Sequence, residues 1–128
     1  MTKFCWDQDE NKTDEGVRVT ECGFVAHPSQ LKYPGDIEMV LLPYSVAASE
    51  HDPMMSPEQA KQTEGILKAK TAKTKDQGVE HEFVMYRGAH HGFAVRADEN
   101  DKEEAEKGKQ AEAQAVKWFS RWFASPSP

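Results

Sequence analysis

Apolar residues gather in three short runs along the chain, and each run has the length of a β-strand. The first run covers residues 22–27 and the second covers residues 44–48. Both are rich in small and β-branched residues without strict alternation, which is typical of strands buried on both faces of a parallel sheet. The third run, residues 81–86, alternates enough to predict another strand. A strong turn signal, Tyr-Pro-Gly-Asp at residues 33–36, separates the first two runs.

A helix is predicted between the second and third runs. Ser56 fits the N-cap, Pro57 fits the first helical position, and Gln59 can close a capping box with Ser56. The helix is expected to continue to about Lys73. Gly65 weakens it, because glycine lowers helix propensity.

A second, amphipathic helix is predicted near the carboxyl end. Asn100 fits its cap, with Glu103 three residues later. Apolar side chains recur at a spacing of three to four residues: Ala111, Ala115, Trp118, Phe119, Trp122 and Phe123. Such a stripe predicts a face that packs on the sheet. Residues 1–16 are expected to form a leading helix and loop, and residues 125–128 a frayed tail.

The expected order is therefore helix, strand, strand, helix, strand, helix. Alternating elements with buried strands indicate the α/β class, with about three parallel strands flanked by helices. A length of 128 residues fits one domain, and 38% hydrophobic against 30% charged residues predicts a lean core.

Charge and composition disfavour several classes of protein. The net charge is −6, and no cluster of Lys and Arg is interleaved with aromatic residues, so no nucleic-acid partner is expected. No apolar run approaches the roughly 18 residues of a membrane span, and residues 1–7 lack the apolar core of a signal peptide. Cys5 and Cys22 lack the spacing of a zinc ribbon or disulfide framework. We therefore expect a cytoplasmic protein without a cofactor or resident metal.

Candidate chemistry lies in residues 86–96, which follow the third predicted strand. This stretch holds His90 and His91, with Gly88 and Gly92 beside them. Imidazole can take and give a proton near neutral pH, and loops at strand ends are where α/β folds keep their chemistry. The alternative is a surface turn with two solvated histidines.

A carboxylate follows the second predicted strand, at Asp52. Neighbouring parallel strands lie about 4.8 Å apart and end on the same rim, so Asp52 can meet His91. A carboxylate bonded to the ring fixes its tautomer and stabilises the imidazolium. The alternative role for Asp52 is an Asx turn before Pro53.

Three stretches carry a family resemblance: residues 23–29, 45–54 and 86–96. Together with the Trp-rich final helix, they resemble the carboxyl-terminal half of the dienelactone hydrolase family, within the α/β-hydrolase fold. The resemblance covers residues 17–124 and implies a partial α/β-hydrolase domain. It also implies a triad in the order nucleophile, acid, histidine. The acid would be Asp52 and the base His91, because the family's histidine directly precedes a small residue and Phe, here Gly92 and Phe93. His90 would be a solvated or ring-orienting neighbour.

The sequence departs from the family at the nucleophile. A G-x-Cys-x-G or G-x-Ser-x-G elbow does not occur, and the glycines at that spacing, Gly88 and Gly92, bracket His90. Cys5 lacks flanking glycines, and Cys22 lies in a predicted strand. The resemblance therefore predicts a truncated protein that is inactive alone. If completed, it would hydrolyse a small-molecule ester or lactone, and whether this chain is an enzyme stays open.

Two other functions remain as alternatives. A fragment cut before residue 23 would expose the edge of its first strand, which could pair in a homodimer or with a complementing amino-terminal half. The chain would then be a non-catalytic interaction module. Alternatively, His51, Asp52, His90 and His91 are ligand types that suit zinc. Adjacent histidines point apart on extended backbone, which weighs against this metal site.

Overall fold

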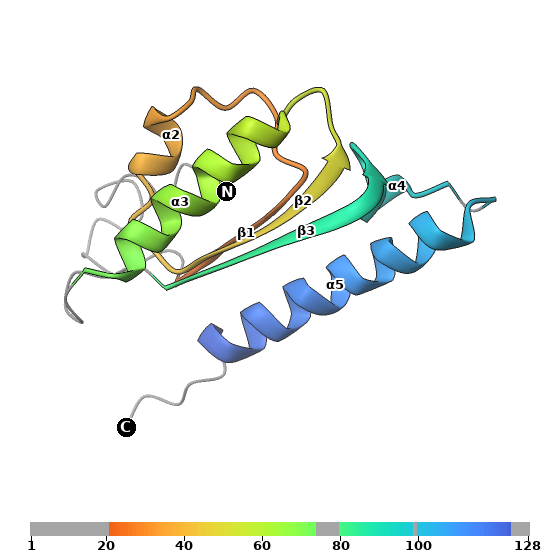
Figure 1. Ribbon diagram of the computed structural model, residues 1–128. Coiled ribbons are helices and arrows are strands. Elements are labelled where there is room, and N and C mark those ends of the chain that lie inside the picture. The colour runs from red at the N-terminus through yellow and green to blue at the C-terminus, as the bar shows by residue number, and fades with distance from the viewer. Residues whose placement is uncertain (1–20, 74–79, 99, 124–128) are drawn as a thin grey trace.

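The computed structural model describes residues 21–73, 80–98 and 100–123 and contains a three-stranded parallel sheet. Its strands are β1 (Gly23–Ala26), β2 (Tyr44–His51) and β3 (His81–His90), in that spatial order (Figure 1). The predicted α/β class and parallel pairing are thus confirmed. The leading helix and loop and the frayed tail expected from the sequence lie outside the described residues.

The central strand β2 explains why its sequence does not alternate. It pairs with β1 on one side and with β3 on the other, so that Tyr44 lies opposite both Gly23 and His81. Helices cover both faces of the sheet, and residues 44–49 are all buried. A strand enclosed on both faces needs apolar or small side chains at every position.

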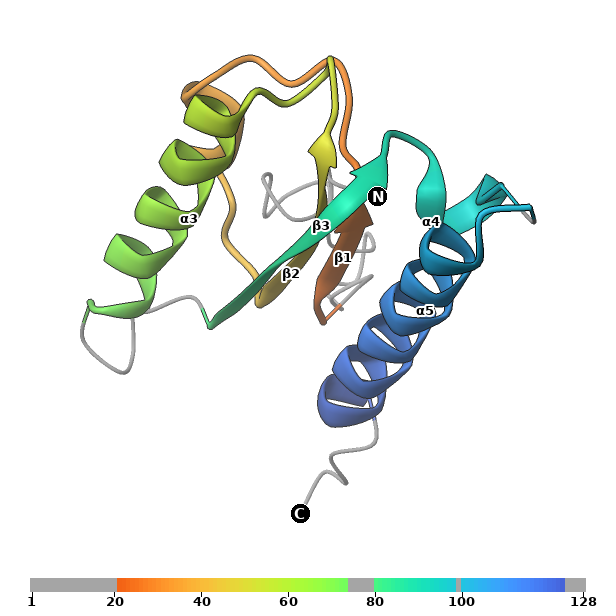
Figure 2. The same ribbon diagram turned by 45° about the vertical axis from the view of Figure 1, so that its right-hand side comes forward.

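Two helices lie on opposite faces of the sheet, as Figure 2 shows: α3 (Pro57–Thr71) and α5 (Lys102–Phe123). A short helix, α2 (Gly35–Glu38), lies beside α3, and another, α4 (Phe93–Arg96), lies beside α5. Each face has its own apolar core. Tyr44, Val46 and Ala48 belong to the core with α3, whereas Ala47 belongs to the core with α4 and α5, because successive strand residues face opposite sides.

The amino end of α3 has the predicted capping box. The Ser56 hydroxyl accepts from the Gln59 N–H at 3.2 Å, and the Gln59 side chain accepts from the Ser56 N–H at 3.0 Å. These bonds satisfy two backbone donors that the helix itself leaves unpaired. The helix ends at Thr71, close to the predicted Lys73.

The predicted cap of α5 was one residue too early. Asp101 Oδ1 accepts from the N–H groups of Glu103 and Glu104, each at 3.1 Å, so Asp101 caps the helix. The N–H of Asn100 donates to Asp98 Oδ1 at 2.9 Å, which places Asn100 in the turn before the helix. An ionised cap also interacts favourably with the positive end of the helix dipole.

The third strand is longer than predicted and takes in part of the expected histidine loop. Pairing with β2 continues past Tyr86 to His90, which lies opposite His51, with an irregularity between Ser49 and His51. Gly88 adopts a φ of 80° inside this stretch, a conformation that glycine allows and that suits a bulged strand. His90 therefore ends the strand, and His91 begins the turn.

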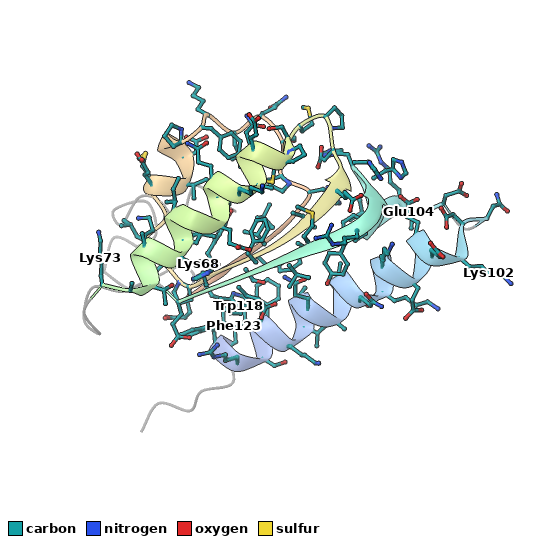
Figure 3. The ribbon with its side chains drawn as sticks, viewed as in Figure 1. Lys68, Lys73, Lys102, Glu104, Trp118 and Phe123 are labelled. Carbon is teal, nitrogen blue, oxygen red and sulfur yellow. The ribbon has the colours of Figure 1, made fainter. Side chains whose placement is uncertain are left out.

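The apolar stripe of α5 packs on the sheet only in part. Ala111 and Trp118 are buried, and Phe119 contacts Phe24 edge-on, but Phe123 is 55% exposed. Positions five apart on a helix with 3.6 residues per turn are about 140° apart, so one flat face cannot cover both Trp118 and Phe123. Figure 3 shows both side chains toward the carboxyl end of α5, away from Glu104.

No helix in the described part of the chain is long and apolar enough to cross a bilayer.

Candidate functional site

The carboxyl ends of the three strands lie on one rim of the sheet, and each is followed by a side chain with candidate chemistry. His27 follows β1, Asp52 follows β2, and His91 follows β3. Parallel pairing makes the strands run in the same direction, so these chain-distant residues become neighbours.

Asp52 and His91 make the closest contact on this rim. His91 Nδ1 lies 2.9 Å from Asp52 Oδ1 and 3.0 Å from Oδ2. The Asp52 side chain is 1% exposed and that of His91 is 25% exposed. An ionised carboxylate only accepts hydrogen bonds, so Nδ1 carries the proton in this contact. In the neutral ring, Nε2 then has a lone pair that can accept a proton.

Asp52 is held by two further donors. The Ser49 hydroxyl donates to Oδ2 at 3.0 Å, and the Met54 N–H donates to Oδ1 at 2.8 Å. The second bond is the Asx turn expected as the alternative role of Asp52, and the same carboxylate meets His91 as well. Ser49, which is buried at the end of β2, was not singled out in the sequence. A serine inside an otherwise apolar buried strand is the signal that could have found it.

His27 is a second imidazole beside His91 that sequence reasoning missed. Its ring centroid lies 5.0 Å from that of His91 and 5.8 Å from that of Phe93, both in edge-on geometry. His27 Nε2 is buried and has no hydrogen-bond partner within the described residues. Burial, followed by the nearby His91, lowers the pKa of His27, which keeps the ring neutral. A histidine that ends a buried strand is the sequence signal for such a position.

His90 belongs to a different set of contacts from His91. Its Nδ1 lies 3.3 Å from Glu104 Oε1, and its side chain is 65% exposed. Its ring centroid lies 5.2 Å from that of His51, whose Nε2 is 3.4 Å from Glu50 Oε1. His90 therefore lies on the solvent side of the rim, next to the Asp52–His91 pair.

The metal site considered as an alternative is wrong. Across the described stretches, which include all four of its ligands, no three His, Cys, Asp or Glu residues are grouped to hold a metal ion. The side chains turn toward separate partners: His91 toward Asp52, His90 toward Glu104 and His51 toward Glu50.

Neither Cys22 nor Ser49 is positioned to serve as a nucleophile for His91. Cys22 precedes β1, at the opposite end of that strand from His27, and it is buried. Burial, with a smaller contribution from Glu21, raises the pKa of Cys22 to about 11, so the thiol stays protonated at neutral pH. The Ser49 hydroxyl donates a hydrogen bond to Asp52. Cys5 lies outside the described residues.

A hollow of about 250 Å³ lies between α3 and β3, but it does not lie over the Asp52–His91 pair. Ser49, Met55, Phe83 and Arg87 are among the residues that line it, whereas Asp52 and His91 do not line it. A substrate at His91 would therefore need further residues to enclose it.

The sequence of this chain is similar to those of known hydrolases. The sequence model described as "Dienelactone hydrolase family" matches residues 23–123. The hydrolase pyvD of Aspergillus violaceofuscus is 30% identical over 103 residues, which cover 80% of this chain and 39% of pyvD. The hydrolase tropI of Talaromyces stipitatus is 29% identical over 103 residues, covering 80% of this chain and 37% of tropI. The chain thus spans about two fifths of the length of these relatives.

Proposed function

Because the chain belongs to the dienelactone hydrolase family, we propose that it carries the acid and the base of a carboxylic ester or lactone hydrolase. Asp52 is the acid and His91 is the base of a nucleophile–histidine–acid triad. The contact of His91 Nδ1 with both carboxylate oxygens of Asp52, at 2.9 and 3.0 Å, is the observation that carries this proposal. The substrate class is a small-molecule ester or lactone.

The geometry supports a specific sequence of proton transfers. His91 Nε2 takes the proton of a thiol or hydroxyl as that group attacks the substrate carbonyl. Asp52 stabilises the imidazolium that forms, because its charge is buried and its oxygens are already oriented by Ser49 and Met54. His91 then gives the proton to the leaving alkoxide, and a water molecule, activated by the same ring, hydrolyses the acyl intermediate.

The attacking group would come from outside the described residues, either in a longer protein or from a complementing chain. The 128-residue sequence holds no elbow of the form Gly-x-Cys-x-Gly or Gly-x-Ser-x-Gly. Among the described strands, β1 pairs with β2 on one edge only. A parallel strand added along the other edge of β1 would end on the same rim, beside His27 and His91. This would bring a nucleophile to His91 without moving Asp52.

A chimera tests the proposal. Residues 23–123 replace the matching segment of the hydrolase pyvD, and hydrolysis of a p-nitrophenyl ester is followed with and without the substitutions. His91→Ala and Asp52→Asn should each lower kcat by about 10⁴-fold, because the base and its orienting acid act as one unit. His51→Ala, which changes an exposed histidine next to Asp52, is the matched control and should change kcat less than about 3-fold. An active chimera that keeps its turnover after both site substitutions would refute the proposal.

A further inference from the structure

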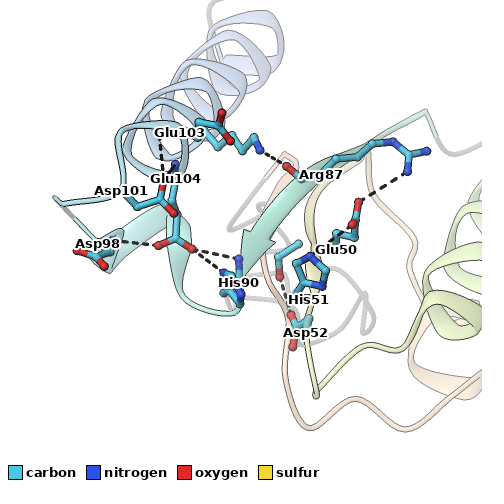
Figure 4. Close-up of polar contacts among 11 residues, drawn as sticks. Glu50, His51, Asp52, Arg87, His90, Asp98, Asp101, Glu103 and Glu104 are labelled. Atoms are coloured by element: carbon cyan, nitrogen blue, oxygen red, sulfur yellow. Dashed lines mark hydrogen bonds and ion pairs between the residues drawn. The ribbon is translucent and has the colours of Figure 1, made fainter.

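A second buried carboxylate, Glu104, binds both ends of the segment that contains His91. Glu104 Oε1 accepts from the His90 N–H at 3.1 Å and lies 3.3 Å from His90 Nδ1. Glu104 Oε2 accepts from the Asp98 N–H at 3.1 Å. Figure 4 shows the Glu104 carboxylate between His90 and Asp98. The Glu104 side chain therefore joins His90, at the end of β3, to Asp98, two residues after the end of α4.

The contacts of Glu104 are those of an ionised carboxylate. The Glu104 side chain is 10% exposed, and both of its oxygens accept hydrogen bonds. The backbone N–H groups of Asp98 and His90 lower the pKa of Glu104, which keeps it charged at neutral pH. Hydrogen bonds to a charged acceptor are roughly twice as strong as neutral ones.

The carboxylate is anchored on a rigid element. Glu104 lies in the first turn of α5, and its own N–H donates to Asp101 Oδ1. The next turns of α5 pack closely on α4, since a Cβ built on Gly108 would lie 2.9 Å from the Phe93 carbonyl oxygen. The segment from His90 to Asp98 is thus fastened at both ends by Glu104 and supported between them by the backbone of α5.

We propose that Glu104 is a positioning residue for the Asp52–His91 pair. Its carboxylate closes residues 90–98 into a clasp that fixes the peptide leading into His91. The ring of His91 is then held where Nδ1 meets Asp52. The role of the Asp52–His91 pair in catalysis rests on the proposed hydrolase function. The clasp itself is a geometric feature, and it can be tested without measuring turnover.

The neighbouring glutamate provides a matched control. Glu103 also donates its backbone N–H to Asp101, but its side chain is exposed. Glu103→Gln and Glu104→Gln remove the same charge from the same helical turn. Only the Glu104 substitution replaces a carboxylate oxygen that accepts a backbone N–H by an amide NH₂, which cannot accept it.

The test uses the isotope-labelled 128-residue chain and a long-range proton–nitrogen correlation spectrum, which reports the tautomer of each histidine. The unmodified chain and Glu103→Gln should both show His91 with the proton on Nδ1. In Glu104→Gln, the fraction with the proton on Nε2 should rise at least about 3-fold. Amide exchange at His90 and Asp98 should be at least about 10-fold faster. The indole signal of Trp118, near the other end of α5, should stay in place.

The outcomes separate a local clasp from general stability. An unchanged His91 tautomer and unchanged amide exchange in Glu104→Gln would overturn the proposal. If Glu104→Gln also displaces the Trp118 signal, Glu104→Asp decides. This variant keeps the charge but shortens the side chain, and the clasp predicts a changed His91 tautomer with a native Trp118 signal. Any other result with Glu104→Asp overturns the clasp. An inactive chimera with the clasp intact would count against hydrolysis alone.

Discussion

His91 Nδ1 lies 2.9 Å from Asp52 Oδ1 although 39 positions separate the two residues in the chain. The sheet brings them together: β2 and β3 are parallel neighbours, and each residue follows the carboxyl end of its strand. The contact therefore depends on strand pairing that the buried core holds in place, and the Asp52 carboxylate also accepts a hydrogen bond from Ser49 of β2.

Ser49 is expected to stabilise the chain through Asp52. Its hydroxyl donates to the buried carboxylate at 3.0 Å, and hydrogen bonds to charged groups contribute about 1.5–3 kcal/mol. Ser49→Ala should lower the free energy of unfolding by that amount, measured by urea denaturation. Ser120→Ala, on the exposed side of α5, should change it by less than about 0.5 kcal/mol. Equal effects of the two substitutions would contradict the role of Ser49.

Two glycine-to-alanine substitutions should act in opposite directions. Gly92 follows His91 and has a φ of 94°, where an L side chain costs about 1–2 kcal/mol, and its Cβ would meet the Arg96 side chain. Gly92→Ala should therefore destabilise the fold by that amount. Gly65 lies inside α3, and a Cβ atom at this position would have no neighbouring atom within 4 Å. Gly65→Ala should stabilise the fold by about 0.5–1 kcal/mol. Thermal unfolding of both variants shows whether each substitution raises or lowers the stability of the fold. A change in the same direction for both variants would refute the explanation.

Gln114 is expected to fasten α5 to the sheet. Its Nε2 donates to Ser45 Oγ at 2.9 Å and to the Val46 carbonyl at 3.1 Å, and its Oε1 accepts from the Tyr86 hydroxyl at 2.7 Å. Gln114→Leu keeps a similar volume but leaves buried polar groups unpaired, which should cost about 2–4 kcal/mol.

The control for this network is the exposed Gln110, one helical turn earlier. Gln110→Leu should change the free energy of unfolding by less than about 0.5 kcal/mol in the same urea titration. A Gln114→Leu variant as stable as the original chain would show that the network contributes nothing net.

His27 should make the fold sensitive to mild acid. Its pKa is lowered in the folded chain, first by burial and then by His91, whereas the unfolded chain binds the proton near pH 6.5. The unfolded state thus takes up more protons as the pH falls, so the free energy of unfolding decreases from about pH 7.5 to about pH 5.5. His27→Phe should flatten this part of the stability curve. Parallel curves for both chains would contradict the assignment.

Local signals sufficed for the elements that depend on neighbouring residues. The Ser56–Gln59 box and the three strands could be predicted because capping and the apolar pattern of a strand are visible in adjacent residues. The meeting of Asp52 with His91 followed from one further step, since parallel strands end on one rim. The predicted cap, Asn100, lies one residue before the observed cap, Asp101, because both residue types cap helices well and sequence alone cannot fix a helix start to one residue.

Tertiary contacts explain what the sequence did not reveal. The extension of β3 to His90 depends on its pairing with β2 beyond a bulge. The approach of His27 to His91 and of Glu104 to His90 depends on which faces of β1 and α5 turn toward the rim. Their partners lie 64 and 14 positions away in the chain, and no local periodicity encodes such pairs.

The tautomer of His91 in the unmodified chain tests the central claim most directly, because the ionised Asp52 carboxylate can only accept a hydrogen bond. The long-range proton–nitrogen correlation spectrum at neutral pH should show the proton on Nδ1 and a bare Nε2, and Asp52→Ala should abolish this preference. A His91 ring that carries its proton on Nε2 in the unmodified chain would contradict the pairing and the proposed roles of both residues.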